Sequence, residues 1–231
     1  MLDKALVEDI QFKKRAIQEE LLKWCKEYYR YFPWRENRTP YSILVAEVLL
    51  KRTTASAVNG MYENFLKMYP DVKVLAKANF KELETTLSKL GYHKVRTRIL
   101  IEMANYILEN HKGKIPKNKD RLLKIPHVGN YTANSILSFA YNIPAAILDT
   151  NVERIFRRVF LRNAPITTSL KPFQEIADSI MPKRNNQIYN YALLDLGGTV
   201  CISGLPRCHL CPIKSVCDYY LLGKPQSSIK H

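Results

Sequence analysis

Hydrophobic positions along the chain recur at spacings of three and four residues, which is the period of an amphipathic α-helix. In "FKELETTLSKLGY" the apolar positions Phe80, Leu83, Leu87 and Leu90 follow this spacing, and Gly91 is a helix-stop signal. The chain has only 8 glycines and no alternating runs around Asn-Gly or Asp-Gly turns, so β-hairpins are not expected. The pattern therefore predicts an all-α fold, with helices over approximately 8–31, 40–52, 56–69, 95–111, 118–125, 131–141, 151–161, 172–181 and 188–200.

One of these helices contains a charge where the pattern is apolar. All eight residues of Ile43–Leu50 are apolar except Glu47. A carboxylate buried on an apolar helix is costly unless it is paired or holds its proton through a raised pKa. Glu47 lies either on a solvated face of the helix or in the interior for a functional reason. Thr39-Pro40 and the capping box Thr150–Glu153 are predicted helix starts.

Charge narrows the class of partner. The 231 residues suit one large domain or two small ones, and 36 Lys and Arg against 21 Asp and Glu give a net charge of +15. Such a chain is expected to bind polyanions, nucleic acid first, although a merely basic surface is the alternative. No stretch reaches the roughly 18 apolar residues of a membrane span. The N-terminus lacks a signal-peptide core, so an intracellular, cytoplasmic protein is expected, with a frayed tail at 224–231.

The cysteines are the strongest chemical signal in the sequence. In "CISGLPRCHLCPIKSVC" six, two and five residues separate Cys201, Cys208, Cys211 and Cys217. Four thiolates this close can bind one soft metal centre, and a reducing compartment disfavours disulfides. A structural zinc site is the alternative, although zinc ribbons usually pair two C-x2-C knuckles and only one is present. The distant Cys25 is predicted to be a small buried hydrophobe.

The segment "LLKIPHVGNYTANSIL", residues 122–137, predicts a helix, a Pro-His-Val-Gly turn and a second helix. Backbone amides at such a turn, which includes Val128 and Gly129, form an anion site suited to a DNA phosphate. Lys124 adds positive charge nearby. The alternative is a plain helical hairpin without a ligand.

Asp149 ends the apolar run in "AAILDTNVERIFRR" and precedes the next predicted helix. An Asp in this position is usually a helix cap. The second helix of the hairpin could instead return Asp149 to the cleft that contains the hairpin turn. The four arginines that follow, Arg154, Arg157, Arg158 and Arg162, form either a solvated face or a track for phosphates.

These motifs, in this order, resemble the helix–hairpin–helix family of DNA glycosylases that carry an iron–sulfur cluster. The resemblance extends from about Trp24 to Cys217, and the cysteine spacing is similar to that of its endonuclease III and MutY branches. It implies a [4Fe–4S] cluster on the four cysteines. "IPHVGNYTA" resembles the family hairpin L-P-G-V-G-x-x-T-A, with His127 in place of the first glycine, and His tolerates the left-handed backbone region.

The segment "PWRENRTPYSILVAEVLLKRTTA" resembles MutY and, more closely, the archaeal G/T mismatch glycosylase Mig. The resemblance implies that Glu47 acts as a general acid on a flipped-out base, with Asp149 stabilising positive charge on the sugar. Asn151 would help to position these groups. Where endonuclease III has a Lys nucleophile, this chain has Tyr131, which cannot form a Schiff base, so little or no AP-lyase activity is expected. A purely structural Tyr131 is the alternative.

Two further residues match positions that contact DNA in the family. Tyr92 would fill the gap left by the flipped base, and Arg52 would contact the orphaned guanine. Both are alternatively plain surface residues. The "LLKRTTA" segment, together with a chain that ends soon after the cysteines, favours thymine or uracil opposite guanine over MutY-type adenine opposite guanine or 8-oxoguanine.

The resemblance also implies the organisation of the molecule. Residues 34–146 would form a helical domain with the hairpin, and residues 1–33 with 147–231 would form the cluster domain. Double-stranded DNA with a mismatched or damaged base would bind a monomer across the cleft between them. The expected function is base excision repair by a DNA glycosylase, and a non-catalytic DNA-damage-binding protein is the alternative from another class.

Overall fold

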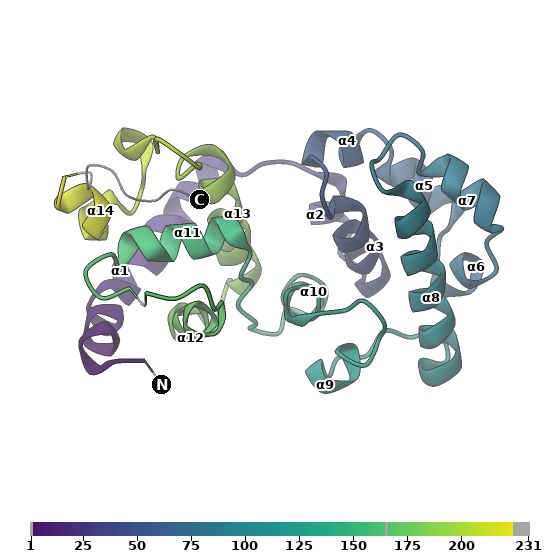
Figure 1. Ribbon diagram of the computed structural model, residues 1–231, viewed down its shortest axis with the longest axis horizontal. Helices are drawn as coiled ribbons and strands as arrows, with labels where there is room; N and C mark the ends of the chain where they lie inside the picture. Colours follow the sequence, from purple (N-terminus) through teal and green to yellow (C-terminus); the bar gives the residue numbers. More distant parts are fainter. Residues whose placement is uncertain (1, 165, 224–231) are drawn as a thin grey trace. The chain divides into compact units, whose positions relative to one another are not determined.

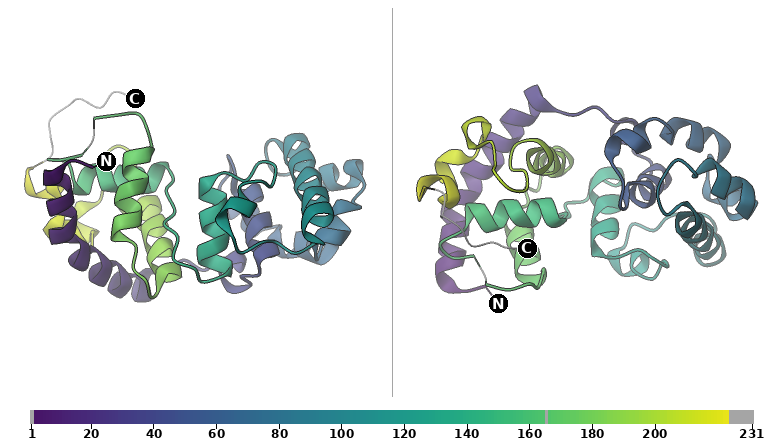
Figure 2. Two further views of the ribbon diagram at one scale, coloured as in Figure 1. Left: turned by 90° about the horizontal axis from the view of Figure 1, so that it is seen from below. Right: turned by 45° about the horizontal axis from the view of Figure 1, so that its top comes forward.

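The computed structural model describes residues 2–164 and 166–223, and this part of the chain is helical without any strand. The predicted all-α fold is confirmed. Two compact units are present: residues up to Arg30 join those from Pro144 onwards, and Tyr31–Ile143 form the second unit (Figures 1 and 2). The predicted boundaries lie a few residues further along the chain, and the predicted tail at 224–231 lies outside the described residues. Among the described helices, none has the length and apolar character to cross a membrane.

The second unit is built around α8, the longest of its helices. α8 packs against α3, α6 and α7, and α3 also packs against α10 and the π-helix that continues it (Figure 1). The core therefore joins the helix with Glu47 to the hairpin. The elements are α2 Pro33–Glu36, α3 Pro40–Leu50, α4 Ala55–Asn59, α5 Tyr62–Met68, α6 Val72–Ala76, α7 Phe80–Thr86, α8 His93–His111, α9 Lys119–Leu122, α10 Asn130–Ser135 and the π-helix Ile136–Ala140.

Two helix predictions for this unit were wrong in detail, and two short helices were missed. The helix predicted over 56–69 is two helices, α4 and α5, separated at Gly60 and Met61. The helix expected to run to Gly91 ends at Thr86, because Leu90 instead closes a tight turn by donating its amide to the Leu87 carbonyl at 2.8 Å. The short helices α2 and α6 were not predicted, since four or five residues are too few to show an apolar period.

In the first unit, the N-terminal helix packs against helices from the C-terminal half of the chain. α1 contacts α12 and α13, and α11 contacts α12, α13 and α14 (Figures 1 and 2). The buried face of α1 includes Cys25, as predicted. The elements are α1 Lys4–Tyr28, α11 Thr150–Val159, α12 Lys171–Ile180, α13 Asn186–Thr199, the 3-10 turns Cys208–Leu210 and Lys214–Val216, and α14 Asp218–Leu221.

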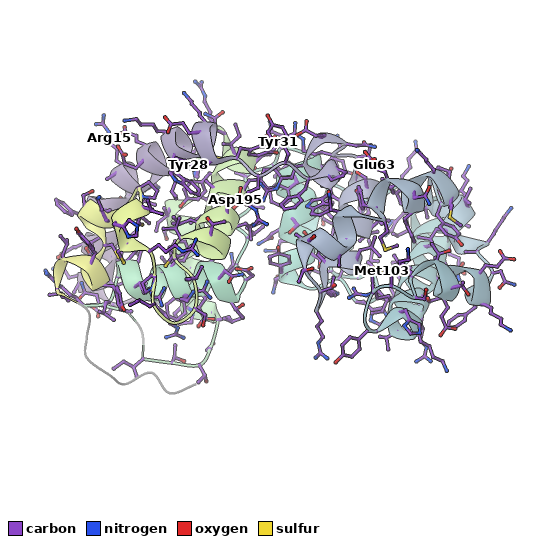
Figure 3. All side chains as sticks on the ribbon, turned by 90° about the horizontal axis from the view of Figure 1, so that it is seen from above. Arg15, Tyr28, Tyr31, Glu63, Met103 and Asp195 are labelled. Carbon is purple, nitrogen blue, oxygen red and sulfur yellow. The ribbon has the colours of Figure 1, made fainter. Side chains whose placement is uncertain are left out.

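Buried charges also join these helices. Lys13 of α1 is 5% exposed, and its Nζ contacts Asp218 Oδ1 at 2.7 Å, Asp9 Oδ2 at 3.0 Å and the Val159 carbonyl at 2.9 Å. Asp195 of α13, labelled in Figure 3, is fully buried and lies 3.7 Å from Arg30 Nη1. The first contact ties α1 to the residue that follows the last cysteine.

Candidate active site and cysteine loop

The helix α3 begins and packs in a way that buries Glu47. Thr39 caps it by accepting the Ser42 amide at 3.0 Å, and Pro40 is its first residue, as predicted. Every residue from Ser42 to Leu49 is buried, and Glu47 is 8% exposed. The interpretation of Glu47 as part of a solvated face was therefore wrong. The acid lies in the interior of the second unit.

Lys51, one turn after Glu47, connects α3 to the hairpin. Burial lowers the pKa of Lys51, and the charge of Glu47 partly offsets this. The Lys51 ammonium donates to the His127 carbonyl at 3.3 Å. The carboxyl-terminal end of α3 and the hairpin turn are therefore in contact.

The hairpin turn lies between α9 and α10. His127 adopts the left-handed region, with φ of 63°, and its Nε2 lies 2.6 Å from Glu102 Oε2. Val128 is buried, and its amide donates to the Ile125 carbonyl at 3.1 Å, so this amide serves the turn rather than pointing outward as predicted. Gly129 is exposed at the start of α10, and a Cβ there would meet no atom within 4 Å. This open space leaves room for a ligand to approach.

The other predicted DNA contacts of this unit are side chains at or near its surface. Lys124 and Arg52 are exposed, Tyr92 is 57% exposed, and Tyr131, the second residue of α10, is half-buried. Arg52 Nη1 donates to the Tyr92 hydroxyl at 3.1 Å, and the guanidinium carbon lies 5.0 Å from the Tyr92 ring centroid. Two residues that were predicted separately are therefore partners.

Asp149 is held rigidly at the start of α11 in the first unit. One carboxylate oxygen accepts the Asn151 amide at 2.9 Å and the Val152 amide at 2.8 Å. The other oxygen accepts Asn151 Nδ2 at 3.0 Å. Asp149 is thus the helix cap, one residue before the predicted start at Thr150. Capping does not exclude a chemical role, because it fixes the orientation of both oxygens.

Arg154 links Asp149 to the cysteine loop through Asn151. This link was not predicted from the sequence. Its Nη2 donates to Asn151 Oδ1 at 2.8 Å and to the Gly197 carbonyl at 2.9 Å, and its Nε donates to the Cys201 carbonyl at 2.9 Å. α11 and α13 approach so closely that a Cβ on Gly197 would lie 2.7 Å from Asn151 Cβ. The carboxylate and the first cysteine therefore belong to one hydrogen-bond network.

The arginines of α11 are half-buried and donate hydrogen bonds within the protein. Arg157 donates to the Thr167 carbonyl at 2.6 Å and lies 4.1 Å from the Phe173 ring centroid. Arg158 donates to Cys201 Sγ at 3.3 Å. These contacts contradict a plain solvated face for the α11 arginines, whereas Arg162, which follows α11, is exposed. A phosphate track stays a prediction.

All four predicted ligand cysteines line one pocket beside Arg158 with about 290 Å³ of space, including solvent-open space. Burial raises the pKa of Cys211 to about 12 and that of Cys217 to about 11. Within the described residues, no three His, Cys, Asp or Glu side chains are placed to hold a single metal ion. Four soft sulfur donors around one pocket fit an iron–sulfur cluster.

Comparison with known proteins identifies the family. Residues 45–175 match the model of the HhH-GPD superfamily base excision DNA repair protein. A thymine-DNA glycosylase of Aeropyrum pernix is 36% identical over 224 residues, which cover 95% of this chain and 97% of that protein. An adenine DNA glycosylase of Mycobacterium tuberculosis is 33% identical over 211 residues, which cover 90% of this chain and 68% of that protein.

Solved structures agree with the sequence match. A thermostable thymine-DNA glycosylase superimposes with a TM-score of 0.86 at 29% identity, covering 92% of this chain and 99% of that one. A non-covalent endonuclease III–DNA complex gives a TM-score of 0.77 at 25% identity, covering 90% and 97%. The chain belongs to the HhH-GPD superfamily of base excision DNA repair proteins, and the predicted family is confirmed.

Proposed function

We propose that this protein is a monofunctional DNA glycosylase that removes thymine or uracil opposite guanine from double-stranded DNA. Glu47 carries the proposal, because it is an acid buried among the apolar residues of α3, at the position where the family motif that the sequence resembles has its general acid. Similarity to a thymine-DNA glycosylase over nearly the whole chain supports the choice of target base.

Glu47 and Asp149 have different roles in the proposed reaction. As the bond between the sugar C1′ and the base nitrogen breaks, its electron pair leaves with the base and Glu47 supplies a proton. Asp149 stabilises the positive charge that develops on the sugar, and water then adds at C1′ and loses one proton to the solvent. The two amides and the Asn151 side chain already hold the Asp149 carboxylate, so this stabilisation is preorganised.

Tyr131 supports a reaction that stops at base removal. It stands at the second position of α10, where the bifunctional branch of the family is expected to have a lysine. A phenol cannot form the Schiff base that leads to strand cleavage. The protein therefore leaves an abasic site in an intact strand.

Several surface features support binding to duplex DNA. Gly129 leaves open space at the start of α10, Lys124 is exposed nearby, and the chain carries a net charge of +15. Arg52 is the candidate contact for the opposing guanine, and Tyr92 is the candidate to fill the base stack.

The four cysteines, Cys201, Cys208, Cys211 and Cys217, would hold a [4Fe–4S] cluster. When bound, the cluster supplies a cross-link that fixes the loop from Cys201 to Cys217. Arg158 lines the same pocket and donates to Cys201 Sγ, so a positive charge faces the thiolate ligands.

The test is a panel of end-labelled duplexes with T, U or A opposite G or 8-oxoguanine, followed by alkali to reveal abasic sites. We expect alkali-dependent cleavage at T and U opposite G. Removal of adenine alone would instead establish the adenine glycosylase alternative. Tight binding to mismatches without removal of any base would establish a non-catalytic damage-binding protein.

Two variants assign the chemistry in the same assay. Asp149→Asn should lower the excision rate on the order of 100-fold or more, and its stability should change little because Asn also caps helices well. Glu47→Gln should lose excision while keeping the fold, because Gln has the same shape and no acid proton. Duplex affinity and iron content serve as controls. An Asp149→Asn variant with wild-type excision would show that Asp149 is only a cap.

A further inference from the structure

Arg96 of α8 is a buried charge that joins two separate turns of the second unit. It is 2% exposed, and burial lowers its pKa. Its Nε donates to the Gly91 carbonyl at 2.9 Å, and its two terminal nitrogens donate to the Val48 and Lys51 carbonyls. One guanidinium thus connects the end of α3 to the turn that precedes α8.

Each of these turns leads directly into a residue with strained backbone. Arg52 follows Lys51 with φ of 52°, and Tyr92 follows Gly91 with φ of 59°. The left-handed region costs a residue other than glycine about 1 kcal/mol or more and persists only where the surroundings hold it. Two of the three carbonyls that Arg96 binds, those of Lys51 and Gly91, immediately precede the two strained residues, so Arg96 is placed to hold both.

The strained backbone brings two exposed side chains together. Arg52 donates to the Tyr92 hydroxyl at 3.1 Å, and its guanidinium carbon lies 5.0 Å from the ring centroid, within the range of a cation–π contact. Both side chains remain accessible on the surface. Ordering them before DNA arrives removes part of the entropy cost of binding.

We propose that Arg96 is a positioning residue that holds Arg52 and Tyr92 as one preassembled reader of the base pair under attack. Tyr92 enters the base stack and Arg52 meets the orphaned base, so their mutual geometry sets the selectivity for guanine. Arg96 itself touches no DNA and acts through these two side chains. This inference rests on the proposed function, and the experiment below separates the two.

Two variants of Arg96 and one control variant test the role of Arg96. Arg96→Met removes all three hydrogen bonds to carbonyls, and Arg96→Lys keeps the charge but cannot satisfy three carbonyls with the same planar geometry. Arg98→Met is the matched control, because Arg98 is exposed on the same helix two residues away. Single-turnover excision of uracil is measured opposite G and opposite A, together with thermal unfolding and the fluorescence of 2-aminopurine beside the target.

The expected result is a loss of selectivity as well as of rate. Excision opposite G should fall on the order of 10- to 100-fold in Arg96→Met, as for a group displaced by about 1 Å, with a smaller loss in Arg96→Lys. Excision opposite A should fall less, so the ratio of the two rates narrows. The 2-aminopurine signal of base flipping should fall in parallel, and Arg98→Met should match the wild type.

A double-mutant cycle with Tyr92→Ala excludes a general structural role. If Arg96 acts through Tyr92 and Arg52, Arg96→Met should cost much less in the Tyr92→Ala background than in the wild type. If the losses in excision rate of Arg96→Met and Tyr92→Ala multiply in the double variant, Arg96 merely stabilises the unit. Equal losses of rate opposite G and opposite A would show the same. If all Arg96 variants excise at the wild-type rate, the inference is overturned and the proposed function is not affected. A wild type that excises neither T nor U would overturn the proposed function.

Discussion

Gly197 offers the sharpest test of how the Asp149 carboxylate is held. The variant Gly197→Ala adds one methyl group to α13, against Asn151 rather than against Asp149 itself. Its Cβ would lie 2.7 Å from Asn151 Cβ and 3.5 Å from Ile155 Cδ1. Asn151 donates to Asp149 and accepts from Arg154, so a displaced Asn151 disturbs the whole network.

The distances set the size of the effect. Carbon atoms rest about 3.5–4.0 Å apart, so α13 and the start of α11 must separate by roughly 1 Å. Overpacking of this kind costs about 1–3 kcal/mol, and the change from Gly to Ala within a helix returns about 1 kcal/mol. The net loss of stability is therefore modest. A displacement of about 1 Å at a catalytic group lowers rates by about 100-fold.

The assay compares single-turnover excision with thermal unfolding and iron content. Gly198→Ala is the matched control, because it makes the same change at the next position of the same helix. Its Cβ would approach only the flexible Arg30 side chain, at 3.2 Å from Nη1. We expect Gly198→Ala to keep nearly wild-type excision, while Gly197→Ala loses most of it and still folds.

Two outcomes would refute this reasoning. If Gly197→Ala excises at the wild-type rate, the position of Asn151 does not control the Asp149 carboxylate. If both glycine variants lose activity equally, the loss reflects α13 as a whole rather than the contact with Asn151. Loss of iron in proportion to activity would place the defect in the cysteine loop instead.

Three further predictions concern Tyr131, the iron–sulfur cluster and the buried ion pair of Lys13. Tyr131→Lys should allow borohydride to trap a covalent DNA adduct, and efficient trapping by the wild type would contradict a monofunctional enzyme. Purified protein should contain about four irons per chain, which Cys211→Ser should lose together with thermal stability; stoichiometric zinc without iron would contradict the cluster. Lys13→Met should lower the free energy of unfolding by up to about 3–5 kcal/mol in denaturant melts, since it removes the 2.7 Å partner of buried Asp218 and leaves only the Arg162 amide at 3.1 Å and Arg162 Nε at 3.9 Å. The exposed Arg15, labelled in Figure 3, is the control, and equal effects of Arg15→Met and Lys13→Met would refute this.

Long helices with clear caps were predictable from the sequence, and short or irregular ones were not. Thr39 and Pro40 marked the start of α3, and the apolar period carried α8 to its end at His111. α1 begins four residues earlier than expected, at Lys4, because the Asp3 carboxylate accepts the Ala5 amide at 2.8 Å. α2 and α6 depend on the packing around them, which a local pattern does not contain.

The features of the candidate site likewise divide into those that the sequence predicts and those that it does not. The cysteines are close in sequence, so their spacing alone indicated a metal centre. Arg154 and Gly197 are 43 residues apart, and nothing in "LLDLGGTV" distinguishes Gly197 from any helix glycine. The partnership of Arg52 with Tyr92, 40 residues away, likewise requires the packing of α3 against α8. Contacts between helices decide these roles, so only the structure reveals them.

A charged residue in line with an apolar face is nevertheless a readable signal. Lys13 continues the buried face of α1, Arg96 continues that of α8, and Glu47 interrupts the apolar run of α3; all three are buried. The pattern predicts burial, but the contacts decide the role. Lys13 and Arg96 bind carboxylates or carbonyls of other segments, so they act as cross-links and their removal should cost stability or geometry. Glu47→Gln should instead cost activity without stability, because Gln keeps the shape of the side chain and loses only the acid proton. Lys13→Met should therefore lower the free energy of unfolding, whereas Glu47→Gln should lower the excision rate. This difference would separate a buried charge with a structural role from one with a chemical role.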